Sequence, residues 1–386
     1  MRCVIKSDKI LGPEGLYNGY LLFRDGKVEE LCGESVDCDA YYDFTGKYVS
    51  PGFIDLHTHG GNGISFAECT PDEIICGCNF HLAHGTTTIL PTISTGPFQE
   101  MKAAVETIAK AMDSGKSVAN IVGAHLEGPY LSQQQCGAQR PGVITPPIRE
   151  EYEGLVESYG KYIARWSYAP ENDRDNEFGK YISSHNILAS AGHTNATYEE
   201  MVPAIETGCN LITHLFSCTS TITRDHGFRH LGVIETAFLR DDLYVEIIAD
   251  GKHLPPELIQ LIIKIKGIDK VALVTDSLPA AGLREKSGIM SGTPYIVEDG
   301  VAKLADRSAF AGSIATANML IRTLTQACGY SVTEAVHMMT VVPAQILGIK
   351  KGCFQPEYDA DIIVFDDDIR VSDVFVGGEK VVLNWQ

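Results

Sequence analysis

The sequence predicts an α/β protein in which a (β/α)₈ TIM barrel carries a small β-sandwich domain formed by the N- and C-terminal segments. Eight short apolar stretches alternate with segments of helical periodicity, which is typical of a parallel sheet with helical crossovers. Histidine, glutamate and aspartate residues repeatedly follow these stretches. Because the reacting groups of such barrels lie where the strands end, these positions predict one shared site.

The predicted barrel strands are short runs bounded by polar or turn-forming residues. We place them at residues 53–58, 86–91, 121–126, 164–169, 187–192, 211–214, 243–249 and 271–275. Helical periodicity between them is clearest at residues 99–112, 198–207 and 256–265. Eight parallel strands are the number that closes a barrel of this class.

The segments on either side of the barrel also have strand character. Residues 1–50 have the pattern of short strands with an Asp25-Gly26 turn, and residues 352–386 continue the same pattern. The strand patterns of the second segment fall at 361–365, 371–376 and 380–383. Each segment is too short to form a core alone, so we expect the two to pair beside a barrel at 51–351. A hairpin is expected at 288–303, after the eighth strand.

The first predicted strand ends in a pair of histidines. Alternate residues of a strand share a face, so His57 and His59 can point at one metal ion. The third, fifth, sixth and eighth strands are followed by Glu127, His193, His214 and Asp276. Each of these alone has an ordinary explanation as a buried histidine or a helix-capping acid, but together at strand ends they predict a metal site. Imidazole and carboxylate ligands suit zinc or iron.

The composition indicates a large globular protein. The 386 residues are 44% hydrophobic and 21% charged, which is enough to bury a sizeable core. The net charge of −19 disfavours nucleic acid and anionic membranes as partners. No apolar run approaches the roughly 20 residues of a bilayer span, and the first residues lack a signal-peptide core.

The 11 cysteines have no framework spacing. Cys76 and Cys78 lie in a predicted helix, which turns their sulfur atoms away from each other and disfavours a metal site. Free thiols are therefore expected. A cytoplasmic location is expected because the sequence has neither a bilayer-length apolar run nor a signal-peptide core.

Nine short motifs carry a resemblance to a known family. They are Pro51-Gly52-Phe53-Ile54-Asp55-Leu56-His57-Thr58-His59-Gly60-Gly61, Gly85-Thr86-Thr87, His125-Leu126-Glu127-Gly128-Pro129-Tyr130, Gly192-His193-Thr194-Asn195-Ala196, Thr213-His214-Leu215, Ala249-Asp250-Gly251-Lys252-His253, Thr275-Asp276, Ala311-Gly312-Ser313 and Asp359-Ala360-Asp361. Through them the chain resembles the amidohydrolase superfamily and, within it, the N-acetylglucosamine-6-phosphate deacetylase family, over nearly its whole length. The segment at Glu127 is the most specific, because most of the superfamily takes a bridging lysine from strand four and residues 164–169 contain none.

The resemblance implies a metal-dependent hydrolase that removes the N-acetyl group of N-acetylglucosamine 6-phosphate. The resemblance implies one or two divalent ions per subunit, zinc or iron, and the intact pair of histidines favours two. The implied ligands of the main ion are Glu127, His193 and His214, and those of a second ion, bridged through Glu127, are His57 and His59. Asp276 is expected to move a proton from the attacking water to the departing nitrogen. His253 matches the family histidine that contacts the scissile carbonyl, although a loop histidine can also cap the helix that follows it.

Three other activities remain open from the sequence. The substrate could be a different N-acyl amino sugar, such as the galacto epimer. The chain could be a cyclic amidase of the same superfamily, against which the missing strand-four lysine counts. It could also be a non-catalytic barrel that binds a carbohydrate or phosphate, against which Asp276 beside a full ligand set counts.

The expected substrate-binding residues are Gln139, Ser217, Cys218, Arg224, Arg229, His253, Phe310 and Gly312. The family loop after the strand-six histidine usually has Asn-Ala-Met and then an arginine that reaches across a dimer interface, so a homodimer is implied. Here that loop has Ser217-Cys218-Thr219, and either Arg224 or Arg229 could clamp a phosphate or be a solvated surface charge. Gln139 replaces a family histidine that touches the sugar, and it can hydrogen-bond a hydroxyl without carrying charge.

Overall fold

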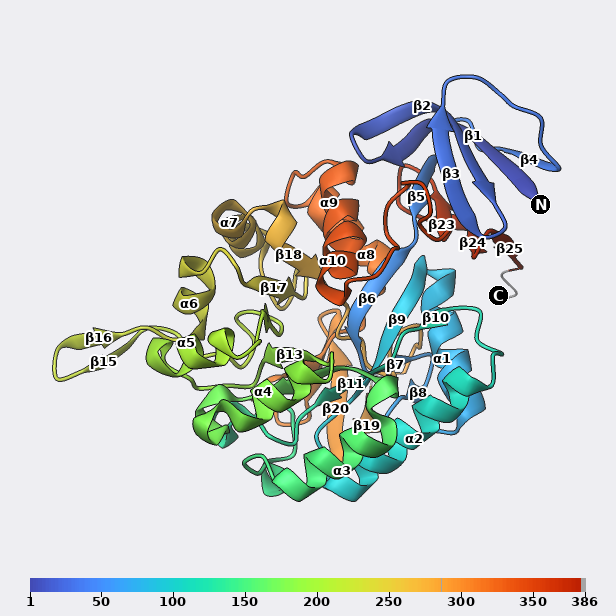
Figure 1. Cartoon of the computed structure of the whole chain (residues 1–386). Coiled ribbons are helices and arrows are strands. Elements are labelled where there is room, and N and C mark those ends of the chain that lie inside the picture. Colours follow the sequence, from blue (N-terminus) through green and yellow to red (C-terminus); the bar gives the residue numbers. More distant parts are fainter. Residues whose placement is uncertain (286, 383–386) are drawn as a thin grey trace.

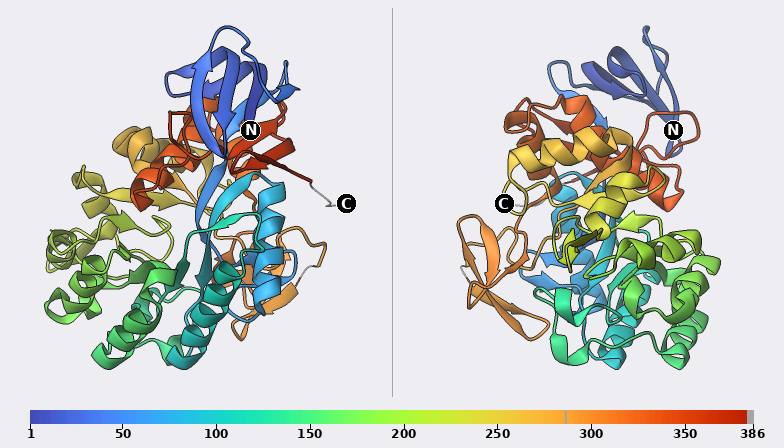
Figure 2. Two further views of the ribbon diagram at one scale, coloured as in Figure 1. Left: turned by 45° about the vertical axis from the view of Figure 1, so that its right-hand side comes forward. Right: turned by 90° about the vertical axis from the view of Figure 1, so that its left-hand side faces the viewer.

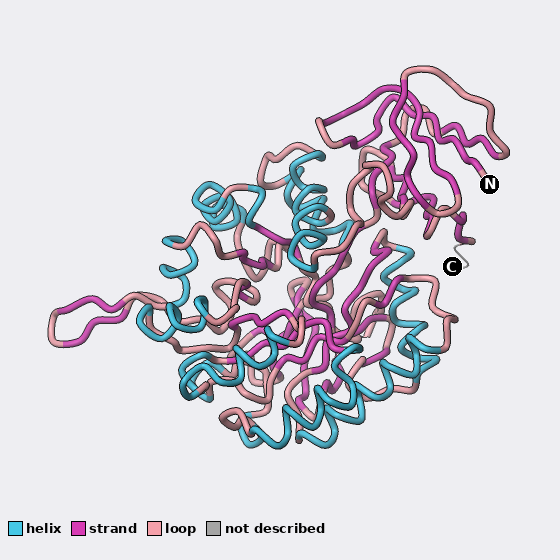
Figure 3. Tube along the Cα trace, in the orientation of Figure 1, coloured by secondary structure: helices cyan, strands magenta, loops and turns pink. Residues whose placement is uncertain are grey.

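Eight parallel strand positions lie at the centre of the molecule and helices surround them (Figure 1; Figure 3). The computed structural model describes residues 1–285 and 287–382. The barrel strands are β6 (Phe53–Thr58), β9 (Thr86–Ile93), β10 (Asn120–Ile121) with β11 (Ala124–Glu127), β12 (Ile163–Tyr168), β13 (Leu188–Ala191), β14 (Leu211–Ile212), β17 (Tyr244–Ile247) and β18 (Val271–Leu273). Each overlaps a predicted strand, so the barrel prediction is confirmed.

The third predicted strand is divided in two by Gly123. This glycine has a φ of 140°, which a residue with a side chain rarely adopts. An added Cβ would also lie 2.8 Å from the Ala164 Cβ of the next strand. The break therefore allows close packing between the third and fourth strands.

Ten helices are described, most of them on the outside of the barrel (Figure 3). They are α1 (Pro71–Ala83), α2 (Phe98–Asp113), α3 (Arg149–Tyr159), α4 (Glu177–Ser184), α5 (Tyr198–Glu206), α6 (Val233–Leu239), α7 (Pro256–Lys266), α8 (Ala317–Gln326), α9 (Val332–Met339) and α10 (Val341–Leu347). Capping boxes begin α1, at Thr70 and Glu73, and α5, at Thr197 and Glu200. Within the described residues, no helix has the length and apolar character of a membrane span.

The barrel seam between its first and last strands is joined by residues at the strand ends. Among the described residues β6 and β18 form no strand ladder. Instead, the Thr275 hydroxyl donates to the Asp55 carboxylate at 2.6 Å. The backbone N–H of Asp276 donates to the His57 carbonyl, and that of His59 donates to the Ser277 carbonyl, each at 2.9 Å. These bonds hold the ends of strands one and eight in register at one end of the barrel.

The N- and C-terminal segments pair in one sheet beside the barrel (Figure 1, upper right). Within the described residues it has eight strands, which are β1 (Arg2–Gly12), β2 (Gly15–Arg24), β3 (Lys27–Cys32), β4 (Ala40–Asp43), β5 (Tyr48–Pro51), β23 (Ile362–Phe365), β24 (Val371–Val376) and β25 (Glu379–Val381). β5 pairs with β1 in parallel and with β23 antiparallel, which joins the two chain ends. The last residue of the strand predicted at 380–383 lies outside the described residues.

We propose that this sheet, from residues 1–50 and 352–386, is one domain and that residues 51–351 form the other. A separate apolar cluster supports this division. It includes Ile5, Leu21, Phe23, Val49, Ile362 and Phe375, which come from both segments and are buried.

Two antiparallel insertions project from the barrel. The predicted hairpin at 288–303 belongs to a four-stranded sheet of β19 (Ser287–Met290), β20 (Thr293–Glu298), β21 (Val301–Leu304) and β22 (Phe310–Gly312), seen in orange in the right view of Figure 2. A second hairpin, β15 (Thr223–Asp225) with β16 (Phe228–His230), extends away from the barrel at the left of Figure 1. A short pair, β7 (Gly60–Gly61) with β8 (Ile64–Ser65), follows the first barrel strand.

Candidate metal centre

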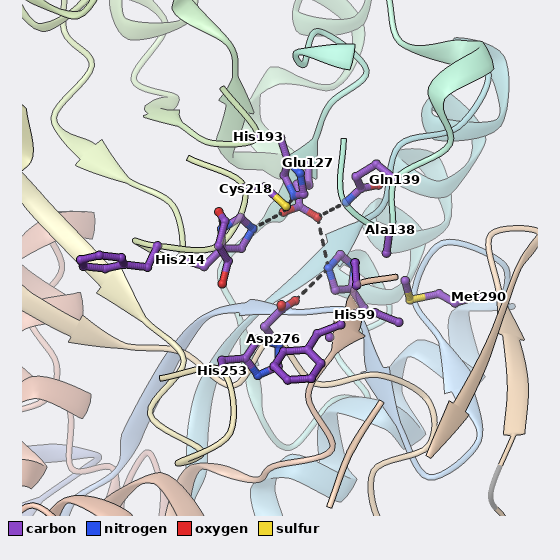
Figure 4. Close-up of a pocket in the computed structure, with 16 residues that line it drawn as sticks. His59, Glu127, Ala138, Gln139, His193, His214, Cys218, His253, Asp276 and Met290 are labelled. Atoms are coloured by element: carbon purple, nitrogen blue, oxygen red, sulfur yellow. Dashed lines mark hydrogen bonds and ion pairs between the residues drawn. The ribbon is translucent and has the colours of Figure 1, made fainter. Parts of the chain in front are cut away.

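A cavity of about 230 Å³ lies at the C-terminal ends of the barrel strands (Figure 4). It brings together eleven of the predicted site residues, which are His59, Glu127, Gln139, His193, His214, Ser217, Cys218, His253, Asp276, Phe310 and Gly312. His57 is fully buried beside them. The inserted four-stranded sheet closes one side of the cavity, since it contributes Met290 and Phe310.

The Glu127 carboxylate lies between two groups of histidines. Its Oε1 is 3.2 Å from His193 Nε2, 3.0 Å from His214 Nε2 and 3.4 Å from His57 Nε2. Its Oε2 is 3.2 Å from His59 Nε2. The histidines of the fifth and sixth strands thus lie at Oε1, whereas the first-strand pair is divided, with His57 at Oε1 and His59 at Oε2.

Asp276 lies beside the histidine pair of the first strand. Its Oδ1 is 3.2 Å from His59 Nε2 and 3.5 Å from His57 Nε2. Two overlapping sets of ligand atoms result, one from His57, Glu127 and His214 and one from His57, His59 and Asp276, with all atoms of a set within 4.8 Å of one another. Both sets are buried, and their nitrogen and oxygen donors suit a divalent transition metal.

Outer hydrogen bonds orient the histidine rings for metal binding. His193 Nδ1 is 2.9 Å from the Gln135 carbonyl, and His214 Nδ1 is 3.1 Å from the Ser217 carbonyl. A carbonyl oxygen only accepts, so each Nδ1 carries a proton, and Nε2 is the ring atom that faces the cavity. His59 Nδ1 has the Ser94 hydroxyl at 2.9 Å. For His193 and His214, this arrangement leaves Nε2 as the nitrogen that can ligate a metal ion.

The backbone turns sharply at three of these residues. His193, His214 and Asp276 have φ values of 47°, 29° and 46°, in the left-handed region that costs energy for residues other than glycine. Backbone hydrogen bonds stabilise these conformations. For example, the Ser132 N–H donates to the His193 carbonyl at 2.8 Å. The turns explain why the fifth, sixth and eighth strands end earlier than predicted.

The two carboxylates of the cavity are ionised. Burial alone would raise the pKa of Glu127, but the charges of His57 and His193 hold it well below its usual range. Burial likewise opposes ionisation of Asp276, and His57 with His59 lowers the pKa of Asp276 below its ordinary value. The site therefore presents negative charge to a cation.

A buried ion pair spans the barrel beneath this site. Arg165 on β12 and Glu246 on β17 are both fully buried, and the Arg165 guanidinium binds both carboxylate oxygens, with Nη2 to Oε2 at 2.8 Å. Arg165 also donates to the Thr213 hydroxyl at 2.8 Å and the Leu56 carbonyl at 3.2 Å. Glu246 Oε2 is 3.7 Å from His57 Nδ1, which has no hydrogen-bond partner among the described residues. Neither residue was predicted from the sequence to have a role at the site.

His253 is held at the cavity wall by an aspartate three residues before it. Its Nδ1 is 2.8 Å from Asp250 Oδ2, and Asp250 Oδ1 accepts the backbone N–H groups of Lys252 and His253 at 2.8 Å. The His253 ring also contacts the Phe310 ring, with centroids 4.9 Å apart. The sequence motif contained Asp250, but only the structure shows that this aspartate orients the histidine.

The predicted substrate-binding residues occupy different places. Ser217 and Cys218 line the cavity from the loop after His214. Arg224 and Arg229 lie on the exposed hairpin β15–β16, outside the cavity lining. Among the described residues that line the cavity none is lysine or arginine.

Comparisons with known proteins place this geometry in context. The Amidohydrolase family profile matches residues 48–381. The chain is 30% identical to N-acetylglucosamine-6-phosphate deacetylase of Danio rerio, over 98% of this chain and 91% of that protein. It is 26% identical to N-acetylgalactosamine-6-phosphate deacetylase of Escherichia coli O157:H7, over 98% and 99% of the two chains. The crystal structure of N-acetyl-D-glucosamine-6-phosphate deacetylase from Mycobacterium smegmatis superposes with a TM-score of 0.91 at 30% identity, covering 98% of this chain and 100% of that one.

Proposed function

The chain belongs to the amidohydrolase family, and from this membership we infer that it is a metal-dependent hydrolase that removes the N-acetyl group of N-acetylglucosamine 6-phosphate, giving glucosamine 6-phosphate and acetate. The observation that carries this proposal is the Glu127 carboxylate between two groups of histidines, with Asp276 beside them. The extended similarity to sugar-phosphate deacetylases supports the substrate class.

We assign one divalent ion to Glu127, His193 and His214, and a second to His57 and His59 with the same carboxylate as a bridge. Glu127 Oε1 lies 3.2 Å from His193 Nε2 and 3.0 Å from His214 Nε2, and Glu127 Oε2 lies 3.2 Å from His59 Nε2, which supports this assignment. The nitrogen and oxygen donors suit zinc or iron. A divalent ion bound there lowers the pKa of a coordinated water and polarises the acetyl carbonyl.

Proton movement falls to Asp276 in this proposal. Its carboxylate is ionised and lies in the cavity, so it can accept the proton of the attacking water and then deliver it to the departing amine nitrogen. His253, fixed through Nδ1 by Asp250, keeps its Nε2 for the acetyl group of the substrate.

We further propose that the phosphate is held by an arginine of a second subunit in a homodimer. The cavity lining described above contains no basic side chain, whereas the hairpin β15–β16 carries Arg224 and Arg229. This hairpin also exposes apolar surface. Phe228 is 73% exposed, and Ile222, which directly precedes β15, is 51% exposed. An arm with arginine and exposed apolar groups suits insertion into a neighbouring subunit.

Replacing Arg224 or Arg229 with alanine is expected to raise KM by roughly 10-fold or more for the arginine that binds the phosphate, because a charge-assisted bond is lost. The effect on kcat should be smaller, since the phosphate is remote from the reacting amide. Steady-state kinetics with the phosphorylated sugar measure both constants. Arg174→Ala serves as the control, because Arg174 is 95% exposed and away from the hairpin. Unchanged KM in both hairpin variants would place the phosphate elsewhere.

Acetate release is the direct test of the proposed activity. The zinc- or iron-loaded protein is expected to release acetate from N-acetylglucosamine 6-phosphate faster than from its galacto epimer, and much faster than from the unphosphorylated sugar. The epimer is included because one relative is an N-acetylgalactosamine-6-phosphate deacetylase. Faster release from the galacto phosphate would assign the chain to that substrate, and no release from any of the three would reject the deacetylase proposal. A cyclic amidase is disfavoured, because β12 offers no lysine.

A cytoplasmic location is also proposed. All 11 cysteines of the chain are free thiols in the structure, as proteins of reducing compartments usually have. The net charge of −19 disfavours nucleic acid as a partner and is compatible with a small-molecule substrate that is bound in a protected cavity.

A further inference from the structure

We propose that Gln139 is a positioning residue that fixes the Glu127 carboxylate between two cation positions, so that binding of the second cation, beside His57 and His59, depends on it. This inference rests on the proposed function, because it concerns the same site. It differs from the sequence-based expectation that Gln139 binds the sugar.

The side chain of Gln139 is anchored at both polar atoms. Its Nε2 donates to Glu127 Oε2 at 2.6 Å, and its Oε1 accepts the backbone N–H of Thr95 at 2.9 Å. A backbone N–H only donates, so Oε1 must face Thr95 and the amide must present its N–H to the carboxylate. The Thr95 hydroxyl in turn donates to the Glu127 carbonyl at 2.6 Å. Gln139 is buried, and this network ties it to the third strand of the barrel.

A glutamate carboxylate needs such a partner to keep one orientation. The χ3 torsion of glutamate has a broad distribution, so packing alone defines the carboxylate orientation weakly. Here Oε2 faces His59, whereas Oε1 faces His193 and His214. Oε1 also lies 3.4 Å from His57 Nε2. Rotation of the Glu127 carboxylate about its Cγ–Cδ bond would move both oxygens away from these histidine nitrogens.

The histidines cannot supply this constraint once cations are bound. An imidazole that ligates a cation uses the Nε2 lone pair, and so it has no proton there to donate to Glu127. His193 and His214 already use their Nδ1 protons on carbonyl oxygens. Within the described contacts, the bond from Gln139 is then the remaining side-chain donor to the Glu127 carboxylate.

A neutral donor also suits a site with two cations. A protonated histidine, lysine or arginine at position 139 would place a positive charge within hydrogen-bond distance of the shared carboxylate and would repel a neighbouring cation. The amide of Gln139 donates without charge, and a carboxylate oxygen can accept such a bond while it also ligates an ion. Gln139 therefore orients the Glu127 carboxylate without neutralising its negative charge.

The test is the zinc content and the zinc affinity of Gln139→Met, which keeps the length of the side chain and removes the N–H donor without adding charge. Gln133→Met is the matched control, because Gln133 is exposed on the same loop. Zinc per subunit is measured by plasma mass spectrometry after equilibration with buffered Zn²⁺. Wild type and control are expected to bind two ions. The variant is expected to keep one and to bind the second about 10- to 100-fold more weakly.

Folding and substrate binding are checked separately. The metal-stripped variant should melt at the wild-type temperature, and Gln139→Asn, whose amide is too short to reach both partners, should lose the second ion in the same way. Two ions bound at wild-type affinity in Gln139→Met, with a raised KM for N-acetylglucosamine 6-phosphate, would overturn the proposal and return Gln139 to sugar binding.

The two proposals fail in different ways. A wild-type protein that binds only one zinc ion would overturn the role of Gln139, while acetate release by that protein would still support the deacetylase function. A wild-type protein that binds two ions and hydrolyses none of the hexosamine phosphates would contradict the proposed function and leave the zinc measurements on Gln139 valid.

Discussion

Replacing Asp276 with asparagine is expected to lower kcat by about 10²- to 10⁴-fold and to leave the metal content unchanged. Asparagine keeps an oxygen where Asp276 Oδ1 lies, 3.2 Å from His59 Nε2, but it cannot accept and return a proton. Steady-state kinetics and plasma mass spectrometry on the same preparation measure the two quantities. KM should change much less than kcat, because the lost interaction belongs to the transition state.

Asp299→Asn provides the control for this experiment, since Asp299 lies on the inserted sheet and pairs with Lys303 at 2.6 Å. Its kcat should equal that of the wild type. Turnover at the wild-type level in Asp276→Asn would remove Asp276 from the proton transfer. Loss of metal in that variant would instead show that Asp276 is needed as a ligand.

The largest effect on stability is expected from breaking the buried ion pair of Arg165 and Glu246. Changing either residue to leucine leaves the other charge buried without its partner, which costs about 3–5 kcal/mol of unfolding free energy. The pKa of Glu246 is consistent with this dependence, because burial opposes ionisation and the Arg165 charge nevertheless holds the pKa below its ordinary value. Urea unfolding of the metal-stripped protein measures the change without any contribution from bound ions.

A double-mutant cycle separates the pair from simple burial effects. The Arg165→Leu, Glu246→Leu double variant should be less destabilised than the sum of the two single variants, because no unpaired charge remains. Glu298→Gln is a suitable surface comparison, since it breaks the ion pair of Glu298 with Arg307 on the inserted sheet and should barely move the urea midpoint. Single variants as stable as the wild type would show that water or other groups compensate the remaining charge.

The fold could be predicted from the sequence to the level of strand order, but not to the level of strand ends. Apolar runs at residues 53–58 and 86–91 correspond closely to β6 and β9, because buried parallel strands need continuous apolar faces. The predicted strands at 211–214 and 271–275 are two residues too long at their ends. Periodicity carries no signal for the positive φ values of His214 and Asp276, which end these strands.

The candidate site was predictable where chemistry and strand position coincide. Glu127 and the histidines follow apolar runs, and parallel strands bring such positions to one end of a barrel. The proximity of Glu246 to Arg165 and His57 was not predictable, because a glutamate inside an apolar strand gives no sign of its neighbours across the barrel. Nor could sequence show that Arg224 lies outside its own cavity, since the direction of a projecting hairpin depends on tertiary packing.

The position of β5 in the small sheet sets an order for assembly during synthesis. β5 lies between β1 and β23, and its register pairs Pro51 with Ile362, so nearly the whole barrel is translated between the two partners. Until β23 leaves the ribosome, one edge of β5 has unpaired backbone groups directly before the first barrel strand. Open strand edges template pairing with other chains. A nascent chain that already contains every proposed metal ligand therefore still exposes the unpaired edge of β5, where another chain can pair. This edge is covered only when the C-terminal strand β23 has been synthesised.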